Sequence, residues 1–130
     1  MVIEPVKSDE VILIVDDVEL NRAILSELFQ KEYSILEAEN GAEGWQWIRA
    51  HADALSAVLL DVVMPEMDGL QVLHVLEQQG LLGKIPVFLI TAEASDATMR
   101  EAYELGVMDV ISKPVVPYVV RRRVNSVVEL

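Results

Sequence analysis

The chain has 130 residues, of which 52% are hydrophobic and 25% are charged, and its net charge is −12 at pH 7. Its length is typical of a single domain, and no apolar run approaches the ~20 residues that a membrane span requires. The negative charge argues against nucleic-acid binding, because phosphate groups repel it. The absence of cysteine excludes disulfides and thiolate zinc sites and is consistent with a cytoplasmic location.

Short apolar runs alternate with amphipathic segments along the whole chain. The runs are rich in β-branched residues and leucine, which favours buried strands, and the segments between them carry apolar residues at helical spacing. Residues 1–8 are expected to form a tail and residues 9–130 one domain. The predicted strands are 11–15, 33–38, 57–60, 85–90 and 107–112, and the predicted helices are 18–31, 41–51, 70–79, 97–105 and 117–129.

Strands that alternate with helices predict an α/β fold, in which a doubly wound parallel sheet carries helices on both faces. The apolar spacing also predicts which helical residues face the core. The expected stripe of the first helix consists of Leu20, Ile24, Leu25 and Leu28, and the residues expected to point inward from the second are Ala42, Trp45 and Ile48. Asp96 is the expected cap of the fourth helix.

Polar side chains follow four of the five predicted strands, namely Asp16 and Asp17, Asp61, Thr91 and Lys113. Because the carboxyl ends of parallel strands share one edge of the sheet, these side chains converge if their strands are neighbours. Three carboxylates in a partly desolvated cleft repel one another, and Mg²⁺ with oxygen ligands is the usual remedy. With an added ammonium and hydroxyl, such a cluster suits a phosphoryl group.

Asp61 is the best candidate for a nucleophile, because it ends a short, wholly apolar run and can form an aspartyl phosphate. Asp16 and Asp17 would then hold the metal. Each feature alone has a plainer interpretation: the pair as a helix N-cap, Asp61 as a turn residue and Thr91 as a turn hydroxyl. The combination at four separate strand ends favours the phosphoryl site.

These motifs resemble the receiver domain of two-component response regulators over about residues 9–130. The resemblance rests on Asp16-Asp17, Asp61, Met64-Pro65, Asp68-Gly69, Thr91-Ala92 and Lys113-Pro114. It implies a flavodoxin-like, five-stranded parallel sheet of order 2-1-3-4-5. It also implies a switch that catalyses its own phosphorylation and dephosphorylation, rather than a metabolic enzyme.

The resemblance further implies that Asp61 accepts a phosphoryl group from a phosphohistidine. The donor would be a sensor histidine kinase or a phosphotransfer protein, and the reaction would depend on Mg²⁺. Asp17, Asp61 and the Val63 carbonyl would be direct ligands of the metal, with Asp16 acting largely through water. Phosphorylation of Asp61 would then switch a downstream output.

Two further roles come with the resemblance. Thr91 would contact the phosphoryl oxygens and shift inward on activation. Lys113 would pair with the phosphoryl group, and its bond to Pro114 would be cis, a minority state that the fold must hold.

The sequence departs from the family at one position. An aromatic residue commonly stands three places before the lysine, where this chain has Val110, so the usual threonine–aromatic coupling is not expected. Tyr103 on the preceding helix is interpreted as a half-buried core aromatic in preference to a substitute for the missing switch residue. Val63 and Glu93, each two residues after a site residue, are expected to tune the lifetime of the phosphoryl group.

Arg121–Arg123 lie on the last predicted helix, away from its valine stripe. They form either a solvated basic face or a salt-bridge surface shared with Arg100, Glu101 and Glu104, as homodimers of the family use across the fourth helix, fifth strand and fifth helix. The sequence contains no output domain, so we expect either a stand-alone receiver or a fragment of a longer regulator, and the apolar ending at 127–130 favours the fragment.

Two alternative functions are retained. One is a degenerate receiver that acts only as a protein-interaction module, to which Val110 gives some weight. The other is a phosphatase with an aspartate nucleophile on a similar sheet. Such enzymes carry a strand-ending Asp-x-Asp, which Asp16-Asp17-Val18-Glu19 does not match.

Overall fold

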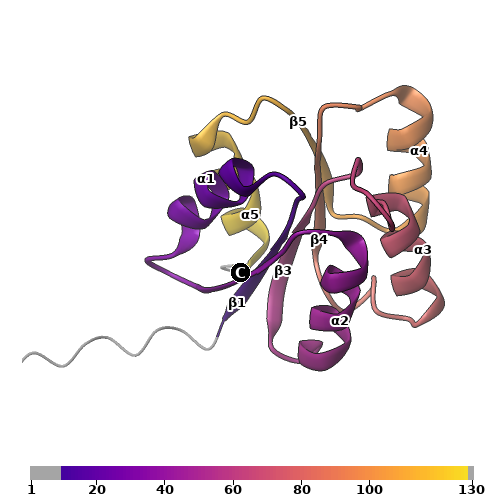
Figure 1. The fold of residues 1–130 in the computed structure, drawn as a ribbon, viewed down its shortest axis with the longest axis horizontal. Coiled ribbons are helices and arrows are strands. Elements are labelled where there is room, and N and C mark those ends of the chain that lie inside the picture. Colours follow the sequence, from indigo (N-terminus) through magenta and orange to yellow (C-terminus); the bar gives the residue numbers. More distant parts are fainter. Residues whose placement is uncertain (1–9, 129–130) are drawn as a thin grey trace, which may run out of the picture.

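The computed structural model describes residues 10–128. The predicted tail and the predicted end of the last helix at Glu129 lie outside the described residues. Strands and helices alternate along the chain (Figure 1). The elements are β1 (Val11–Val15), α1 (Glu19–Phe29), β2 (Ser34–Ala38), α2 (Gly41–His51), β3 (Leu55–Leu60), α3 (Gly69–Gln78), β4 (Val87–Thr91), α4 (Asp96–Leu105), β5 (Asp109–Ser112) and α5 (Pro117–Val128).

The five strands form one parallel sheet in the order β2-β1-β3-β4-β5, which confirms the expected fold class. In the register, Val15 of β1 lies beside Leu60 of β3, and Leu60 lies beside Leu89 of β4. The ends of the central strands are therefore level with one another. Whatever follows them in the sequence emerges at one edge of the sheet.

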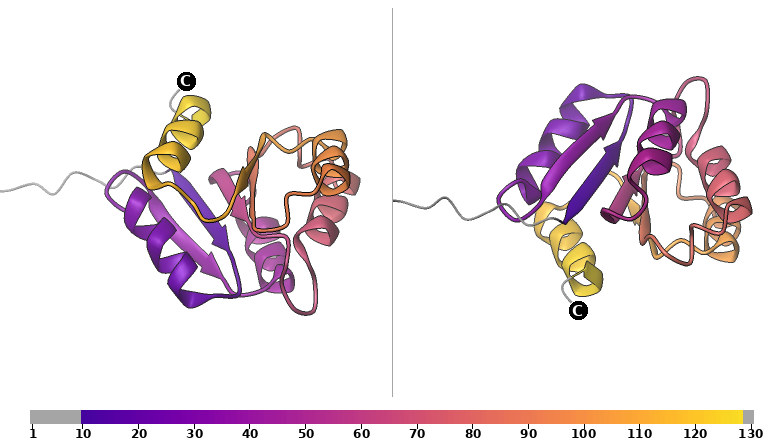
Figure 2. Two further views of the ribbon diagram at one scale, coloured as in Figure 1. Left: turned by 90° about the horizontal axis from the view of Figure 1, so that it is seen from above. Right: turned by 90° about the horizontal axis from the view of Figure 1, so that it is seen from below.

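The strand side chains alternate between two apolar layers. In β1, Leu13 and Val15 pack with residues of α2, α3 and α4, whereas Ile12 and Ile14 pack with residues of α1 and α5. Figures 1 and 2 show these two groups of helices on opposite faces of the sheet. Because both faces are covered, the central strands read as continuous apolar runs rather than alternating ones.

The first helix differs from the prediction in the residues that it buries. Leu25 and Phe29 are buried, whereas Leu20 is 67% exposed and Ile24 is 38% exposed. The first turn of α1 lies at the carboxyl edge, where the sheet beneath it ends. The expected stripe was therefore wrong at its amino-terminal end, and two apolar side chains are left on the surface.

The second helix was also predicted incorrectly at one position, because Ala42 is exposed while Gly41 and Gly44 are buried. A Cβ added at Gly41 would lie 2.0 Å from the carbonyl oxygen of Met67, and one at Gly44 would lie 3.0 Å from Val15. This helix therefore approaches the sheet and the β3–α3 loop through its glycines.

Smaller shifts occur at the element ends. The N-cap of α4 is Ser95, whose side chain accepts a hydrogen bond from the Thr98 amide, and not Asp96. β4 and β5 begin two residues later than predicted, at Val87 and Asp109. None of the helices within residues 10–128 is long and apolar enough to cross a membrane.

Candidate functional site

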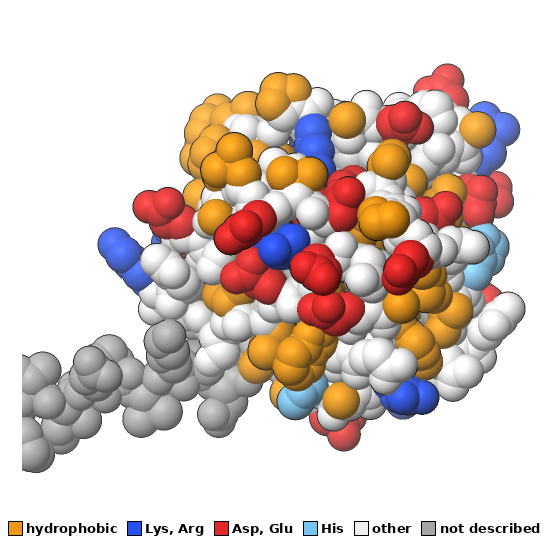
Figure 3. Space-filling model, viewed as in Figure 1, with side chains coloured by type: hydrophobic (Ala, Val, Ile, Leu, Met, Phe, Trp, Pro, Cys, Tyr) orange, Lys and Arg blue, Asp and Glu red, His pale blue; other side chains and the backbone are white. Residues whose placement is uncertain are grey.

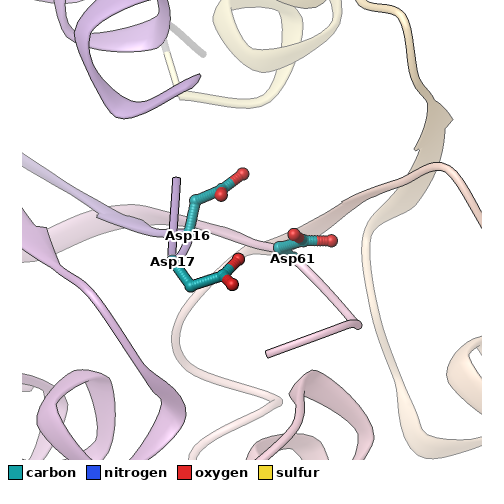
Figure 4. A group of neighbouring side chains, drawn as sticks. All are labelled: Asp16, Asp17 and Asp61. Carbon is teal, nitrogen blue, oxygen red and sulfur yellow. The ribbon is translucent and has the colours of Figure 1, made fainter. Parts of the chain in front are cut away.

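Three carboxylates converge at the carboxyl edge of the sheet (Figure 4). One carboxylate oxygen from each of Asp16, Asp17 and Asp61 lies within 4.8 Å of the other two. Asp16 is 2% exposed and Asp61 is 6% exposed, whereas Asp17 faces solvent. The convergence expected from the strand order is thus present.

The backbone at these positions is held by extensions of the sheet hydrogen bonding. The amide of Asp61 donates to the carbonyl of Val15 at 2.9 Å, and the amide of Asp16 donates to that of Ala38 at 3.1 Å. Asp16 and Asp61 are therefore each anchored one residue beyond a buried strand.

Lys113 links two of these carboxylates. Its Nζ donates hydrogen bonds to Oδ2 of Asp16 at 2.8 Å and to Oδ2 of Asp61 at 3.1 Å. Its own amide donates to the Thr91 carbonyl at 2.9 Å. The Lys113–Pro114 peptide bond is cis, as expected.

Burial and pairing act in opposite directions on the two central ionisable groups. Burial raises the pKa of Asp61, and the hydrogen bond from Lys113 offsets only part of that rise. Burial alone would lower the pKa of Lys113, but its hydrogen bonds to Asp16 and Asp61 raise it overall. Lys113 is therefore firmly cationic, whereas the ionised form of Asp61 is disfavoured relative to a free aspartate.

Thr91 and Val63 border the cluster. Thr91 is fully buried at the end of β4, and its hydroxyl oxygen accepts a hydrogen bond from the Glu93 amide at 3.0 Å. The Val63 amide donates to Oδ1 of Asp61 at 3.4 Å, and the Val63 side chain is 53% exposed. The Val63 side chain therefore stands at the mouth of the site and offers it only apolar surface.

The donor set fits a magnesium ion. Carboxylate and carbonyl oxygens are the ligands that Mg²⁺ prefers, and it needs few of them because it keeps several waters. One lysine faces three carboxylates, so the cluster retains excess negative charge. Asp16, Asp17, Asp61 and the Val63 carbonyl can supply the protein oxygens.

Tyr103 is half-buried, as expected, with 46% of its surface exposed, but it packs in neither of the two apolar core clusters. Its hydroxyl is instead hydrogen-bonded to the edge strand. The hydroxyl accepts from the Val110 amide at 3.2 Å and donates to Oδ1 of Asp109 at 3.1 Å. Burial, together with the Asp109 contact, raises the pKa of Tyr103. The tyrosine thus ties α4 to β5 outside the core.

The sequence prediction missed Arg22. Its Nη1 donates to the Asp16 carbonyl at 2.7 Å, and its Nε donates to Oε1 of Glu37 at 3.1 Å. A signal was available, because helical side chains tilt toward the amino end of their helix. A long cation near the start of α1 can therefore reach back to the loop that carries Asp16 and Asp17.

The surface around the site is divided by character. Figure 3 shows acidic side chains gathered near the middle of this face and hydrophobic ones over α1 and the start of α5. Between α1 and the segment 113–117, which leads from β5 into α5, lies a mainly apolar groove of about 490 Å³. Its lining includes Ile24, Leu25, Ile90, Lys113, Pro114 and Val115.

Fold and site together define a doubly wound α/β protein with an acidic cluster and a lysine at the carboxyl edge of its sheet. The family model of the response regulator receiver domain matches residues 12–125. The chain therefore belongs to the response regulator receiver family, which serves phosphoacceptor signalling in two-component systems.

Individual relatives agree with this assignment. The chain is 32% identical over 118 residues to the chemotaxis protein CheY1 of Helicobacter pylori, covering 89% of this chain and 94% of that protein. It is 35% identical over 116 residues to the transcriptional regulatory protein SrrA of Staphylococcus aureus, covering 88% of this chain but 46% of SrrA. The family thus includes relatives of about this length and relatives about twice as long.

Solved structures show the same fold. The CheX–CheY–BeF3–Mg complex from Borrelia burgdorferi contains a chain with a TM-score of 0.82 and 28% identity, covering 90% of this chain and 87% of that one. Chemotaxis protein CheY4 of Vibrio cholerae has a TM-score of 0.81 at 24% identity, and the match covers 91% of this chain and 98% of that one.

Proposed function

We propose that residues 9–130 form a phosphorylation-controlled receiver that works in the cytoplasm and switches a downstream output. Asp61 takes a phosphoryl group from a phosphohistidine on a histidine kinase or phosphotransfer protein. The observation that carries the proposal is the cluster of three carboxylates within 4.8 Å of one another, two of them bridged by one lysine.

The chain's own groups have distinct parts in this transfer. A carboxylate oxygen of Asp61 attacks phosphorus, a P–O bond forms, and the P–N bond to the donor imidazole breaks. Partial desolvation of Asp61 favours attack, because a poorly hydrated carboxylate is a better nucleophile. Lys113 can exchange its hydrogen bond to Asp61 for one to the transferred phosphoryl oxygens, because the Asp61 oxygen loses its charge when it bonds to phosphorus. Thr91, at the end of the neighbouring strand β4, can donate a hydrogen bond from its hydroxyl.

Mg²⁺ would neutralise the phosphoryl oxygens as charge develops on them. Asp17, Asp61 and the Val63 carbonyl would hold it, with Asp16 contributing through water. After transfer, the same residues would promote hydrolysis of the acyl phosphate on Asp61, so the domain would catalyse its own dephosphorylation.

The proposal is tested by adding beryllofluoride and Mg²⁺ to the protein and following fluorine NMR. We expect a bound signal in the parent and in Asp53→Asn, a control at an exposed acidic position, and no signal in Asp61→Asn. Acetyl phosphate with Mg²⁺ should add one phosphoryl group to the parent by intact mass. A parent that gives neither response would contradict the proposal.

The same assays separate the alternatives. A degenerate receiver would bind neither beryllofluoride nor a phosphoryl group while remaining folded. A phosphatase would turn over small phosphomonoesters such as p-nitrophenyl phosphate many times per chain. The missing Asp-x-Asp spacing argues against that outcome.

The groove between α1 and the segment 113–117 is a suitable docking surface for the phosphohistidine donor. Lys113 forms part of its wall, so a partner seated there would lie beside Asp61. Exposed Leu20 and Ile24 would give such a partner apolar contact area. Leu20→Glu should slow transfer from a donor protein but not from acetyl phosphate. Met108→Glu, at another exposed apolar position directly before β5, should slow neither.

A homodimer through α4, β5 and α5 is proposed for the activated state. Within the chain, Arg121 pairs with Glu32 and Arg123 lies 3.5 Å from Asp109, whereas no ion pair of Arg122 occurs among residues 10–128. Sedimentation with and without beryllofluoride tests this proposal. Arg122→Glu should reduce any activated dimer, and an activated parent that stays monomeric would contradict it.

A further inference from the structure

Arg22 of α1 holds the peptide group that joins the two acidic residues after β1. Its Nη1 atom lies 2.7 Å from the carbonyl oxygen of Asp16, and its Nε lies 3.1 Å from Oε1 of Glu37 at the end of β2. The Arg22 side chain is 13% exposed. The bond to the Asp16 carbonyl is therefore largely shielded from water, whereas the bond to Glu37 is more exposed because the Glu37 side chain is 43% exposed. Together the two bonds make the guanidinium bridge a loop and a strand.

Asp17 is the acidic residue that depends most on this arrangement, because its side chain faces solvent. The direction of its carboxylate follows from the backbone around it. The Asp16 amide is held by the Ala38 carbonyl at 3.1 Å, and the Val18 amide is held by Oδ1 of Asp16 at 2.9 Å. Between these points, Arg22 holds the carbonyl of the Asp16–Asp17 peptide.

We infer that Arg22 is a positioning residue for the metal site. It sets the plane of the Asp16–Asp17 peptide and so directs Asp17 toward Asp61. Glu37 keeps the guanidinium in place, which makes β2, two strands away from β3, a contributor to the site. The inference rests on the proposed Mg²⁺ binding, but its effect on the backbone is a property of the metal-free chain.

An electrostatic role and a positioning role of Arg22 predict opposite changes in Mg²⁺ affinity when Arg22 is replaced by a neutral residue. A cation near a divalent-metal site repels the metal, so a purely electrostatic role means that Arg22→Gln binds Mg²⁺ more tightly. A positioning role means that it binds more weakly. Arg22→Lys also distinguishes the electrostatic role from the positioning role, because lysine keeps the charge but lacks the planar guanidinium that forms two hydrogen bonds. The electrostatic role predicts parent-like Mg²⁺ affinity for this variant, and the positioning role predicts weaker affinity.

The test measures Mg²⁺ affinity by titration calorimetry for the parent, Arg22→Gln, Arg22→Lys and Arg49→Gln. Arg49 is a matched control, since it is exposed and donates to Gln46 on its own helix. We expect roughly tenfold weaker binding in both Arg22 variants and parent-like binding in the control. Parent-like or tighter binding in the Arg22 variants would overturn the inference, whereas a parent without Mg²⁺ affinity would contradict the proposed function.

Nitrogen-relaxation NMR of the metal-free proteins tests positioning without any metal. The Asp17 and Val18 amides should become more mobile in Arg22→Lys, while the β1 amides should not change. Unchanged mobility at Asp17 would overturn the inference even if affinity fell. If denaturant titration shows that Arg22→Gln is not folded in buffer, Glu37→Gln replaces it, because that variant leaves the sequence of α1 unchanged. Asp17 mobility and Mg²⁺ affinity that match the parent in Glu37→Gln would then overturn the inference.

Discussion

Nζ of Lys113 lies 2.8 Å from Oδ2 of Asp16, although the two residues are 97 positions apart in the sequence. The contact joins the end of β5 to the end of β1 across the two strands between them. It places a cation inside a cluster that would otherwise consist of carboxylates. The lysine that is proposed to pair with the phosphoryl oxygens on Asp61 therefore already holds Asp16 and Asp61 together before any phosphoryl group arrives.

Removing this cation is expected to destabilise the metal-free protein. Lys113→Met leaves Asp16 and Asp61 close together without their shared partner, which should lower the free energy of unfolding by about 3 kcal/mol. Added Mg²⁺ should restore part of the loss, because it replaces the missing positive charge. Urea denaturation with and without Mg²⁺ measures both effects. A variant as stable as the parent in EDTA would show that the lysine has no such role.

Asp61→Asn is expected to stabilise the metal-free protein at neutral pH. Burial raises the folded-state pKa of Asp61 above its ordinary value of 3.8, so the folded chain binds this proton more tightly than the unfolded chain does. The contribution of Asp61 to stability is then full below pH 3.8 and is lost as pH rises through the folded pKa. The advantage of the asparagine variant should grow across that window, as denaturation at several pH values would show. An advantage that shrinks with rising pH would contradict the assigned direction.

Gly41→Ala is expected to damage the β3–α3 loop. The new Cβ would lie 2.0 Å from the Met67 carbonyl oxygen, so the loop that carries Val63 must move. Overpacking of this kind costs about 1–3 kcal/mol, and beryllofluoride binding should weaken as well. Gly83→Ala is the control, since a Cβ there meets nothing within 4 Å. Equal stability of the two variants would argue against close packing at Gly41.

Tyr103→Phe is expected to loosen α4 from the edge strand without unfolding the core. The Val110 amide keeps its 2.8 Å bond to Asp109, so the loss of the hydroxyl should cost about 0.5–1.5 kcal/mol. Hydrogen exchange at Val110 should become faster. Tyr118→Phe, at a 74% exposed position, should change neither quantity; a similar effect in both variants would rule out a specific role for the Tyr103 hydroxyl.

Val63 and Glu93 remain predicted determinants of phosphoryl lifetime. The amide side chain in Val63→Asn can orient the attacking water, so dephosphorylation should become severalfold faster. Glu93→Ala removes an exposed charge at the mouth of the site, and we expect it to change the dephosphorylation rate as well. Decay of the acyl phosphate after donor removal measures the rates. Rates that match the parent in both variants would dispose of the idea.

The sequence alone determined the alternation of strands and helices, the sheet class and the polar strand ends. These follow from local signals, since apolar runs, turn residues and the shared edge of parallel strands do not depend on distant contacts. The strand order came from resemblance to the receiver family, and the sheet confirms it. The sequence and the family's strand order together therefore place Asp16, Asp17, Asp61 and Lys113 at one edge of the sheet.

The contacts that hold these side chains in place depend on how the folded elements pack. Arg22 reaches the Asp16 carbonyl because α1 folds back along β1, and Gly41 is buried because α2 meets a loop that follows β3. Tyr103 lies outside the core for a similar reason, since its hydroxyl finds its partners on the edge strand. Such contacts depend on how closely packed elements approach one another, and that distance is not encoded in the periodicity of any one segment.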